Sequence, residues 1–170
     1  MARHGSLVST LVGAAFCLVM INTTPAQPPQ SQPLKSEFNV GFSYLTDFNF
    51  GGSGFTVGYA EKATPWFQVE VQLDANFNLG PTTFDQYTTT GGPKFSLPGK
   101  RLTPYVHMLL GASHFRAFNR TGTEFAVKYG GGLDVTLTRN WAARFELNDL
   151  VIWNPITHNL QVNTGLVVRF

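Results

Sequence analysis

Three of the four histidines in this sequence, His107, His114 and His158, lie beyond the apolar segment near its start and are the first candidates for acid–base chemistry. A histidine beside a hydroxyl and a carboxylate can act as the base that activates a nucleophile. Ser113 and His114 are adjacent, so on a strand they point to opposite faces and cannot pair with each other in this way. His158 can approach Ser113 or Asp149, but nothing in the spacing requires it. We therefore predict that the chain is not an enzyme and keep catalysis as an alternative.

Metal, cofactor and nucleic-acid sites are not indicated. The histidines are far apart, and the single cysteine, Cys17, lies in an apolar segment near the start. These residues do not make a metal-ligand set, so we expect no metal and no cofactor. A net charge of +2 with no basic block also lacks the electrostatic footprint of a protein that binds nucleic acid.

Charged residues of both signs lie on one parity of several alternating segments. Four acids and four bases share it, and a balanced set on one face predicts mutual ion pairing: Glu70, Asp74, Asp134, Glu146, Lys94, Lys128, Arg144 and Arg169. If residues 138–140 form a tight turn, Asp134 faces Arg144 directly. Glu146 then faces Gly132, with open space beside it.

The elements that must position these charges have a period of two. Apolar and polar residues alternate clearly in 38–44, 67–74, 125–137 and 160–170, and more weakly in 55–59, 87–97, 105–114 and 141–150. Alternation of this kind is typical of strands with two chemically different faces. With 170 residues, 43% of them hydrophobic, we expect one folded domain of eight strands.

The connections and the aromatic residues indicate which kind of sheet this is. Connections at 60–65, 98–104 and 138–140 are predicted to be short, and the others longer. Tyr59, Trp66, Tyr105, Trp141 and Phe170 gather near the short-turn end, as an interfacial aromatic belt does. A soluble sheet explains the alternation but not the belt. We predict an all-β, eight-stranded, antiparallel up-and-down transmembrane β-barrel whose lumen is filled by side chains.

The first residues differ from the rest. A short basic start, an apolar run and the small residues around Ala26 predict a signal peptide at 1–26, with an uncleaved anchor as the alternative. Residues 27–35 are rich in Pro and Gln and are predicted to be an extended spacer. The barrel is expected to span residues 36–170.

Three segments carry a family resemblance: 103–111, 130–135 and the final strand, which ends in Gly165-Leu166-Val167-Val168-Arg169-Phe170. With them, the chain resembles the small eight-stranded outer-membrane β-barrel family related to the OmpA transmembrane domain.

The resemblance implies a location in the outer membrane of a Gram-negative-type bacterium. It also implies contact with outer-membrane lipids and lipopolysaccharide, and reading of Phe170 by the assembly machinery. We expect a monomer with a structural, adhesive or surface-interaction role. The alternatives are a lipid A-modifying enzyme and a soluble secreted calyx that binds a small apolar ligand.

Overall fold

The computed structural model describes residues 36–46, 51–77, 84–117, 120–153 and 156–170. The predicted signal peptide (1–26) and spacer (27–35) lie outside the described residues. The described chain forms eight strands: β1 (Ser36–Thr46), β2 (Gly51–Lys62), β3 (Phe67–Phe77), β4 (Phe84–Ser96), β5 (Leu102–Ala117), β6 (Arg120–Thr136), β7 (Trp141–Ile152) and β8 (Thr157–Arg169).

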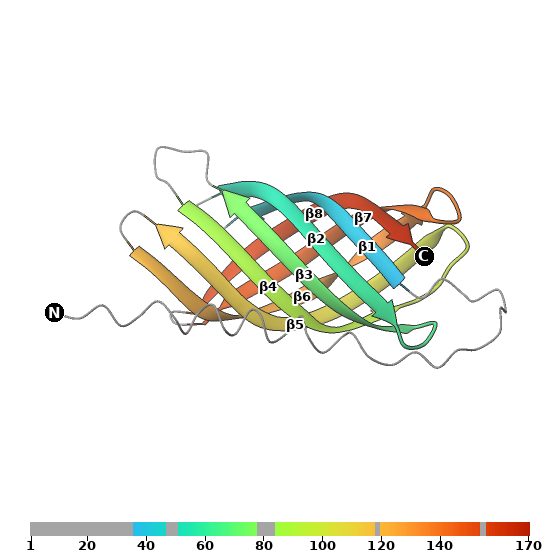
Figure 1. Ribbon diagram of the computed structural model, residues 1–170, viewed down its shortest axis with the longest axis horizontal. Coiled ribbons are helices and arrows are strands. Elements are labelled where there is room, and N and C mark those ends of the chain that lie inside the picture. The colour runs from blue at the N-terminus through green and yellow to red at the C-terminus, as the bar shows by residue number, and fades with distance from the viewer. Residues whose placement is uncertain (1–35, 47–50, 78–83, 118–119, 154–155) are drawn as a thin grey trace. The chain divides into compact units, whose positions relative to one another are not determined.

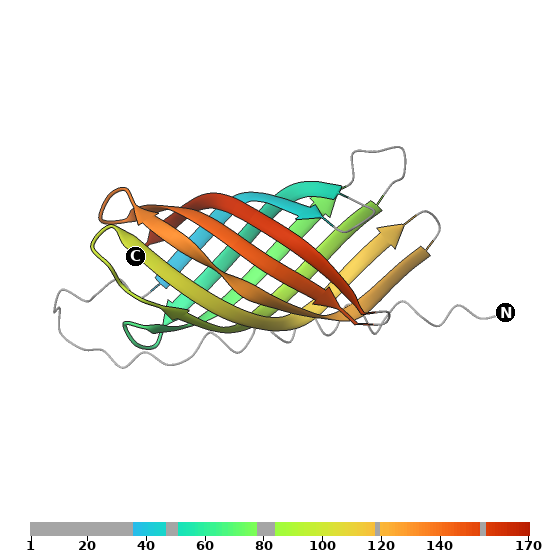
Figure 2. The same cartoon turned by 180° about the vertical axis from the view of Figure 1, so that it is seen from behind.

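The strands close into one barrel. Each strand pairs antiparallel with the next, and β8 pairs with β1 (Figures 1 and 2). The seam ends in two reciprocal backbone hydrogen bonds of 3.0 Å between Ser36 and Phe170. Following the register once around the barrel from Arg169 returns to β8 at Asn159, ten residues earlier. A stagger of this size tilts the strands by about 40°. The predicted fold is confirmed.

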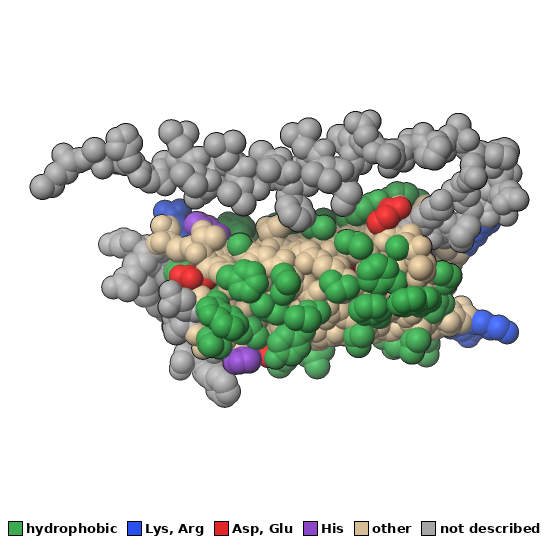
Figure 3. Space-filling view, turned by 90° about the horizontal axis from the view of Figure 1, so that it is seen from below, with side chains coloured by type: hydrophobic (Ala, Val, Ile, Leu, Met, Phe, Trp, Pro, Cys, Tyr) green, Lys and Arg blue, Asp and Glu red, His purple; other side chains and the backbone are tan. Residues whose placement is uncertain are grey.

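The two faces of the sheet have opposite chemistry. Large apolar side chains such as Phe42, Leu73 and Leu147 are exposed on the outside, where Figure 3 shows them covering the side of the barrel. The side chains of Glu70 and Lys128 are fully buried inside. A calyx for an apolar ligand needs the reverse arrangement, so the inside-out distribution contradicts that alternative. No helix among the described residues is long and apolar enough to cross a membrane.

The barrel has two ends, which we name by their connections. The turn end holds the connections 63–66, 97–101 and 137–140, and the loop end holds 47–50, 78–83, 118–119 and 153–156. The prediction that the loop-end connections are longer was wrong. The reason is that the strands continue: β5 has 16 residues and β6 has 17, and Arg116 pairs with Thr121 in a region predicted to be a loop.

The aromatic residues predicted for the belt divide into two groups. Tyr59, Trp66, Trp141 and Phe170 are exposed near the turn end, and Trp66 stacks on Phe95 with ring centroids 6.1 Å apart.

Tyr105 departs from this group, and its assignment to the belt was wrong. It is only 4% exposed and lies inside the barrel. The alternation explains this, because Tyr105 is two residues from the buried His107 and therefore shares its face.

Candidate functional site

The interior charges form the candidate site. The structure places the eight charged residues named from the sequence inside the barrel, where none has a side chain more than 11% exposed. The alternation of each strand puts them there, since their neighbours on either side face outward. Buried charges are tolerated only when they are paired and hydrogen-bonded, so the contacts of each decide what the group can do.

Arg144 on β7 is the centre of these contacts. Its Nε and Nη2 donate to the two carboxylate oxygens of Asp134 on β6 at 2.8 and 2.9 Å. Its Nη2 also lies 3.3 Å from Glu37 on β1, and its Nη1 lies 3.4 Å from Glu70 on β3. One guanidinium therefore joins strands on different sides of the lumen.

Glu37 is a second centre of ionic contacts, and it was not among the residues predicted from the sequence. Its carboxylate contacts Lys62 at 3.1 Å, Arg169 at 3.2 Å, Arg144 at 3.3 Å and Lys94 at 3.4 Å. The predicted strand began at residue 38, so this acid was left out. Extending the alternation of Asn39, Gly41 and Ser43 back by one step would have found it.

Tyr105 occupies the space expected beside Glu146. Its hydroxyl donates to Glu146 Oε1 at 2.6 Å, and Lys94 Nζ lies 4.2 Å from the centre of its ring. Gly132 opposes Tyr105 across β5 and β6, and a Cβ at Gly132 would lie 2.5 Å from the tyrosine hydroxyl. The glycine makes room for an aromatic ring here.

His107 is a hydrogen-bonded interior residue, as the alternation indicates. Its Nδ1 lies 3.0 Å from Glu70 Oε2 and its Nε2 lies 2.9 Å from Asn148 Oδ1.

Glu70, His107 and Glu146 place ligand atoms within 4.8 Å of one another, which suits a metal ion by donor type. Arg144 and Lys94 already contact the Glu70 carboxylate, at 3.4 and 3.9 Å, so side-chain cations neutralise it. We assign no metal to this group.

Gln72 connects the remaining ion pair, between Lys128 and Asp74, to Glu146. Lys128 Nζ binds Asp74, and it also donates to Gln72 Oε1 at 3.3 Å. Gln72 Nε2 in turn donates to Glu146 Oε2 at 3.2 Å. We call the ten ionic residues joined in this way the interior charge network. They are Glu37, Lys62, Glu70, Asp74, Lys94, Lys128, Asp134, Arg144, Glu146 and Arg169.

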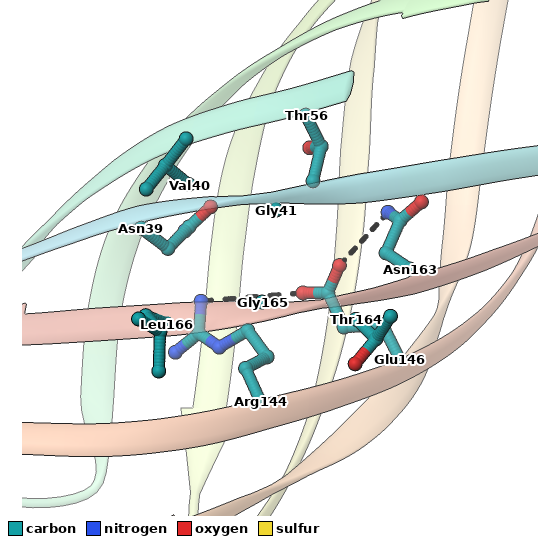
Figure 4. A pocket seen from close by; sticks show the side chains of 10 residues that line it. All are labelled: Asn39, Val40, Gly41, Thr56, Arg144, Glu146, Asn163, Thr164, Gly165 and Leu166. Atoms are coloured by element: carbon teal, nitrogen blue, oxygen red, sulfur yellow. Dashed lines mark hydrogen bonds and ion pairs between the residues drawn. The ribbon is translucent and has the colours of Figure 1, made fainter. Parts of the chain in front are cut away.

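A small pocket lies beside Arg144 and Glu146, under the seam between β1 and β8. Figure 4 shows the Glu146 carboxylate between the Arg144 guanidinium and the Asn163 side chain, with Gly41 and Gly165 also lining the pocket. Asn163 Nδ2 donates to Glu146 Oε2 at 3.0 Å. The cavity volume is about 10 Å³, room for about one water molecule, so this pocket cannot take a substrate.

Ser113 and His114 lie on opposite faces of β5, as predicted. Ser113 is fully buried and accepts from Gln86 Nε2 at 2.9 Å, whereas His114 is exposed and lies 2.8 Å from the Thr123 hydroxyl. Ser113 is therefore not available to His158 or to a lipid outside the barrel.

Three outward-facing residues form a second group that sequence reasoning found only in part. Asp149 Oδ2 accepts from the Tyr129 hydroxyl at 2.6 Å and lies 2.8 Å from His158 Nδ1. We call Tyr129, Asp149 and His158 the outer polar cluster. To activate a nucleophile, an imidazole must lie between the hydroxyl and the carboxylate. Here the carboxylate lies between the other two, so the cluster does not form such a relay.

Residues 14–170 match the family described as "Outer membrane protein beta-barrel domain". No curated protein sequence matches the chain closely enough to count as a relative.

Among solved structures, Neisserial surface protein A aligns with a TM-score of 0.64 at 11% identity, covering 79% of this chain and 96% of that one. The attachment invasion locus protein Ail of Yersinia pestis aligns at 0.60 and 18% identity, covering 82% and 100%. The outer membrane enzyme PagL aligns at 0.52 and 11% identity, covering 78% and 99%. At these identities the likeness shows the fold, which serves both enzymes and other proteins.

Proposed function

Because this chain belongs to the family of outer membrane protein beta-barrel domains, we propose that it acts in the outer membrane as a non-catalytic barrel whose lumen is plugged by its own side chains. Its role is structural, adhesive or in surface interaction. The protein itself is an eight-stranded barrel of the bacterial outer membrane. Beyond this, we propose that the lumen is closed, that the protein has no catalytic activity, and that its role is structural, adhesive or in surface interaction.

The proposal of a closed lumen is supported mainly by Arg144, whose side chain extends across the lumen. From β7 it contacts acids on β6, β3 and β1, so it spans the lumen instead of lining one wall. Eight strands enclose only enough room for side chains, and here charged pairs and Tyr105 occupy that room. An ion in transit would have to break several buried contacts at once.

Planar-bilayer recording tests the plug. The unmodified barrel should show little or no steady conductance, and Glu70→Ala or Lys94→Ala should show small channels more often. Each of these changes removes a cross-link and leaves a buried charge that attracts water. Leu147→Ala, on the lipid-facing side, is the matched control and should stay closed. A large, stable conductance from the unmodified protein would contradict the proposal.

The loop end is the proposed surface for adhesion or other contacts. The paired strands β5 and β6 continue past Ile152, the last residue of β7, and so extend the barrel at this end. Ail, which has the same fold, has been solved in complex with the heparin analogue sucrose octasulfate. For the present chain we propose only that the β5–β6 hairpin is the contacting element.

Cells that display the barrel test this role. Replacing residues 115–122 with a two-residue turn should reduce attachment to a surface coated with heparin, an analogue of which was solved in complex with Ail. A replacement of the turn 138–140, at the other end, is the control. Equal attachment by both variants, at equal surface levels, would contradict a role for the hairpin.

The proposed partners are lipids, lipopolysaccharide and the assembly machinery, with the protein itself a monomer. The apolar outer face supports contact with lipid. The order of groups in the outer polar cluster supports the absence of catalysis, although PagL shows that the fold can host an enzyme. Mass spectrometry of lipid A from cells with and without the chain tests this directly. A new lipid A species that depends on the chain would contradict it.

A further inference from the structure

The outer polar cluster lies in a row of apolar residues. Alternate residues of β7 face outward, and Asp149 is the one charged member of that row, which Trp153 follows directly after the strand: Trp141, Ala143, Phe145, Leu147, Asp149 and Val151. Apolar residues continue beyond it toward the loop end, and its direct partner on β8 is Leu160. Asp149 is therefore inside the apolar band and not above it.

The depth of Asp149 follows from the strand geometry. Eight residues separate it from Trp141 on β7. At about 3.3 Å per residue on a strand tilted by about 40°, this places it roughly 20 Å above the aromatic level of the turn end. The apolar band of such barrels is about 25 Å tall. Asp149 thus lies just below the outer boundary, where the headgroups of outer-leaflet lipids join their acyl chains.

The cluster presents hydrogen-bond acceptors to this layer. Asp149 Oδ2 accepts from the Tyr129 hydroxyl and lies 2.8 Å from His158 Nδ1; with Nδ1 as the donor to this oxygen, a neutral His158 has Nε2 as an acceptor. From the described residues, neither Asp149 Oδ1 nor His158 Nε2 receives a hydrogen bond. The Asp149 side chain is 27% exposed and the His158 side chain is 59% exposed, so lipid can reach both side chains.

A carboxylate at this depth is unfavourable unless it gains partners. Tyr129 and His158 supply two, and a lipid donor would supply more. The ester carbonyls where a diacyl phospholipid joins its chains are acceptors only and cannot serve. Amide N–H and hydroxyl groups on the acyl chains of lipid A are donors at this depth.

We propose that the outer polar cluster binds lipid A at the junction of its headgroup and acyl chains, through donors to Asp149 Oδ1 and His158 Nε2. This inference deepens the proposed contact with lipopolysaccharide, on which it rests, by assigning it a site. The site recognises hydrogen-bond donors. Lipid A carries donors on its acyl chains at this depth, whereas a diacyl phospholipid has only acceptors there.

Vesicles of stated composition test the site. The full barrel is reconstituted in phosphatidylcholine, which has no donors, in phosphatidylcholine with phosphatidylethanolamine, which has an amine only in its headgroup, and in phosphatidylcholine with purified lipid A. Thermal unfolding and the lipid retained in native mass spectrometry are measured. Lipid A should raise the unfolding midpoint and be retained, and phosphatidylethanolamine should do neither.

Variants separate recognition from structure. Asp149→Leu should lower lipid A retention on the order of tenfold, as expected for the loss of a hydrogen bond to a charged group. It should not lower the unfolding midpoint in pure phosphatidylcholine, because it replaces a polar group in an apolar band. His158→Gln should weaken retention less. His114→Gln, at another exposed histidine of the loop end, is the matched control and should retain lipid A fully.

Four outcomes would overturn the site, three of which concern the variant and the lipid controls. Asp149→Leu could retain lipid A like the unmodified chain, phosphatidylethanolamine could stabilise the barrel as much as lipid A does, or Asp149→Leu could destabilise the barrel equally in every vesicle. Retention without dependence on Asp149 would remove this site but leave lipopolysaccharide as a partner. The absence of lipid A retention by the unmodified chain would remove both.

Discussion

Asp134 and Arg144 stand directly opposite each other on β6 and β7, and both oxygens of the carboxylate accept from the guanidinium, at 2.8 and 2.9 Å. Two parallel hydrogen bonds between ionised groups fix the geometry as well as the energy of a pair. The turn at residues 137–140 sets this register, which is the one the sequence predicts. The pair is therefore a direct test of how the interior is held together.

Removing one partner of this pair should destabilise the barrel strongly. Asp134→Asn should lower the free energy of unfolding in detergent on the order of 3 kcal/mol, because it leaves a buried charge without its main partner. Arg144→Met should cost more, since Glu37 and Glu70 also lose a contact. The double variant should cost less than the two single losses added together. Changes within about 0.5 kcal/mol, the range of ordinary surface substitutions, would show that the pair contributes little.

Tyr105→Phe should destabilise the barrel by about 1–3 kcal/mol, the expected loss when a buried acceptor loses its donor. The ring stays in place beside Lys94, so the effect isolates the hydrogen bond to Glu146. Tyr87→Phe is the matched control on the exposed face and should have little effect. Urea titration in detergent measures both, and equal midpoints for the two variants would contradict an interior role for the Tyr105 hydroxyl.

Deleting Phe170 should reduce insertion into the outer membrane of cells, because we propose that the assembly machinery reads this residue. The deletion also removes two backbone hydrogen bonds to Ser36, so Phe170→Ala, which keeps them, is the cleaner variant. Both should refold in detergent nearly as well as the full chain. Equal amounts of all three chains in isolated outer membranes would contradict the prediction.

An unboiled sample of the refolded chain should migrate differently from a boiled one on a denaturing gel. A closed barrel resists detergent until heat opens it, since no strand has a free edge along the seam. Circular dichroism of the unboiled sample should confirm the sheet. A chain that folds in buffer without detergent and does not shift on heating would contradict the membrane barrel.

Mass spectrometry of the chain purified from outer membranes should find Gln27 as the first residue. This follows from the predicted signal peptide at 1–26, whose apolar run is shorter than the about 20 residues that a membrane-spanning helix needs. Treatment that blocks signal peptidase is the control and should leave the precursor. A mature protein that keeps Met1 would instead support the anchor alternative.

The sequence was sufficient for the strands because one face of each touches lipid and the other touches charge. Where that contrast is absent, the strand is not predicted. Strand β2 begins at Gly51, but glycines at residues 51, 52 and 54 show no alternation, so the strand was predicted only from Phe55. The same loss of signal hid the loop-end extensions of β5 and β6.

The contacts across the lumen were less accessible to sequence reasoning. Neighbouring strands can be paired from a tight turn, as Asp134 and Arg144 show. The meeting of Arg144 with Glu37 depends on the stagger of the whole barrel, which no single segment records. Tyr105 illustrates a different error: it was assigned to the aromatic belt because of its residue type, although its position in the alternation places it inside the barrel.

The salt bridge between Glu37 and Arg169 joins the first strand to the last, across 132 residues of sequence. Synthesis delivers β1 long before β8, so the open edge of β1 and the Arg169 partner of Glu37 both wait for the final strand. Pairing of β8 with β1 therefore completes the hydrogen-bond ladder and the set of ion pairs around Glu37 together. A chain that stops short of β8 leaves the edges of β1 and β7 unpaired and Glu37 without Arg169, so the same strand serves both the backbone and the interior charges.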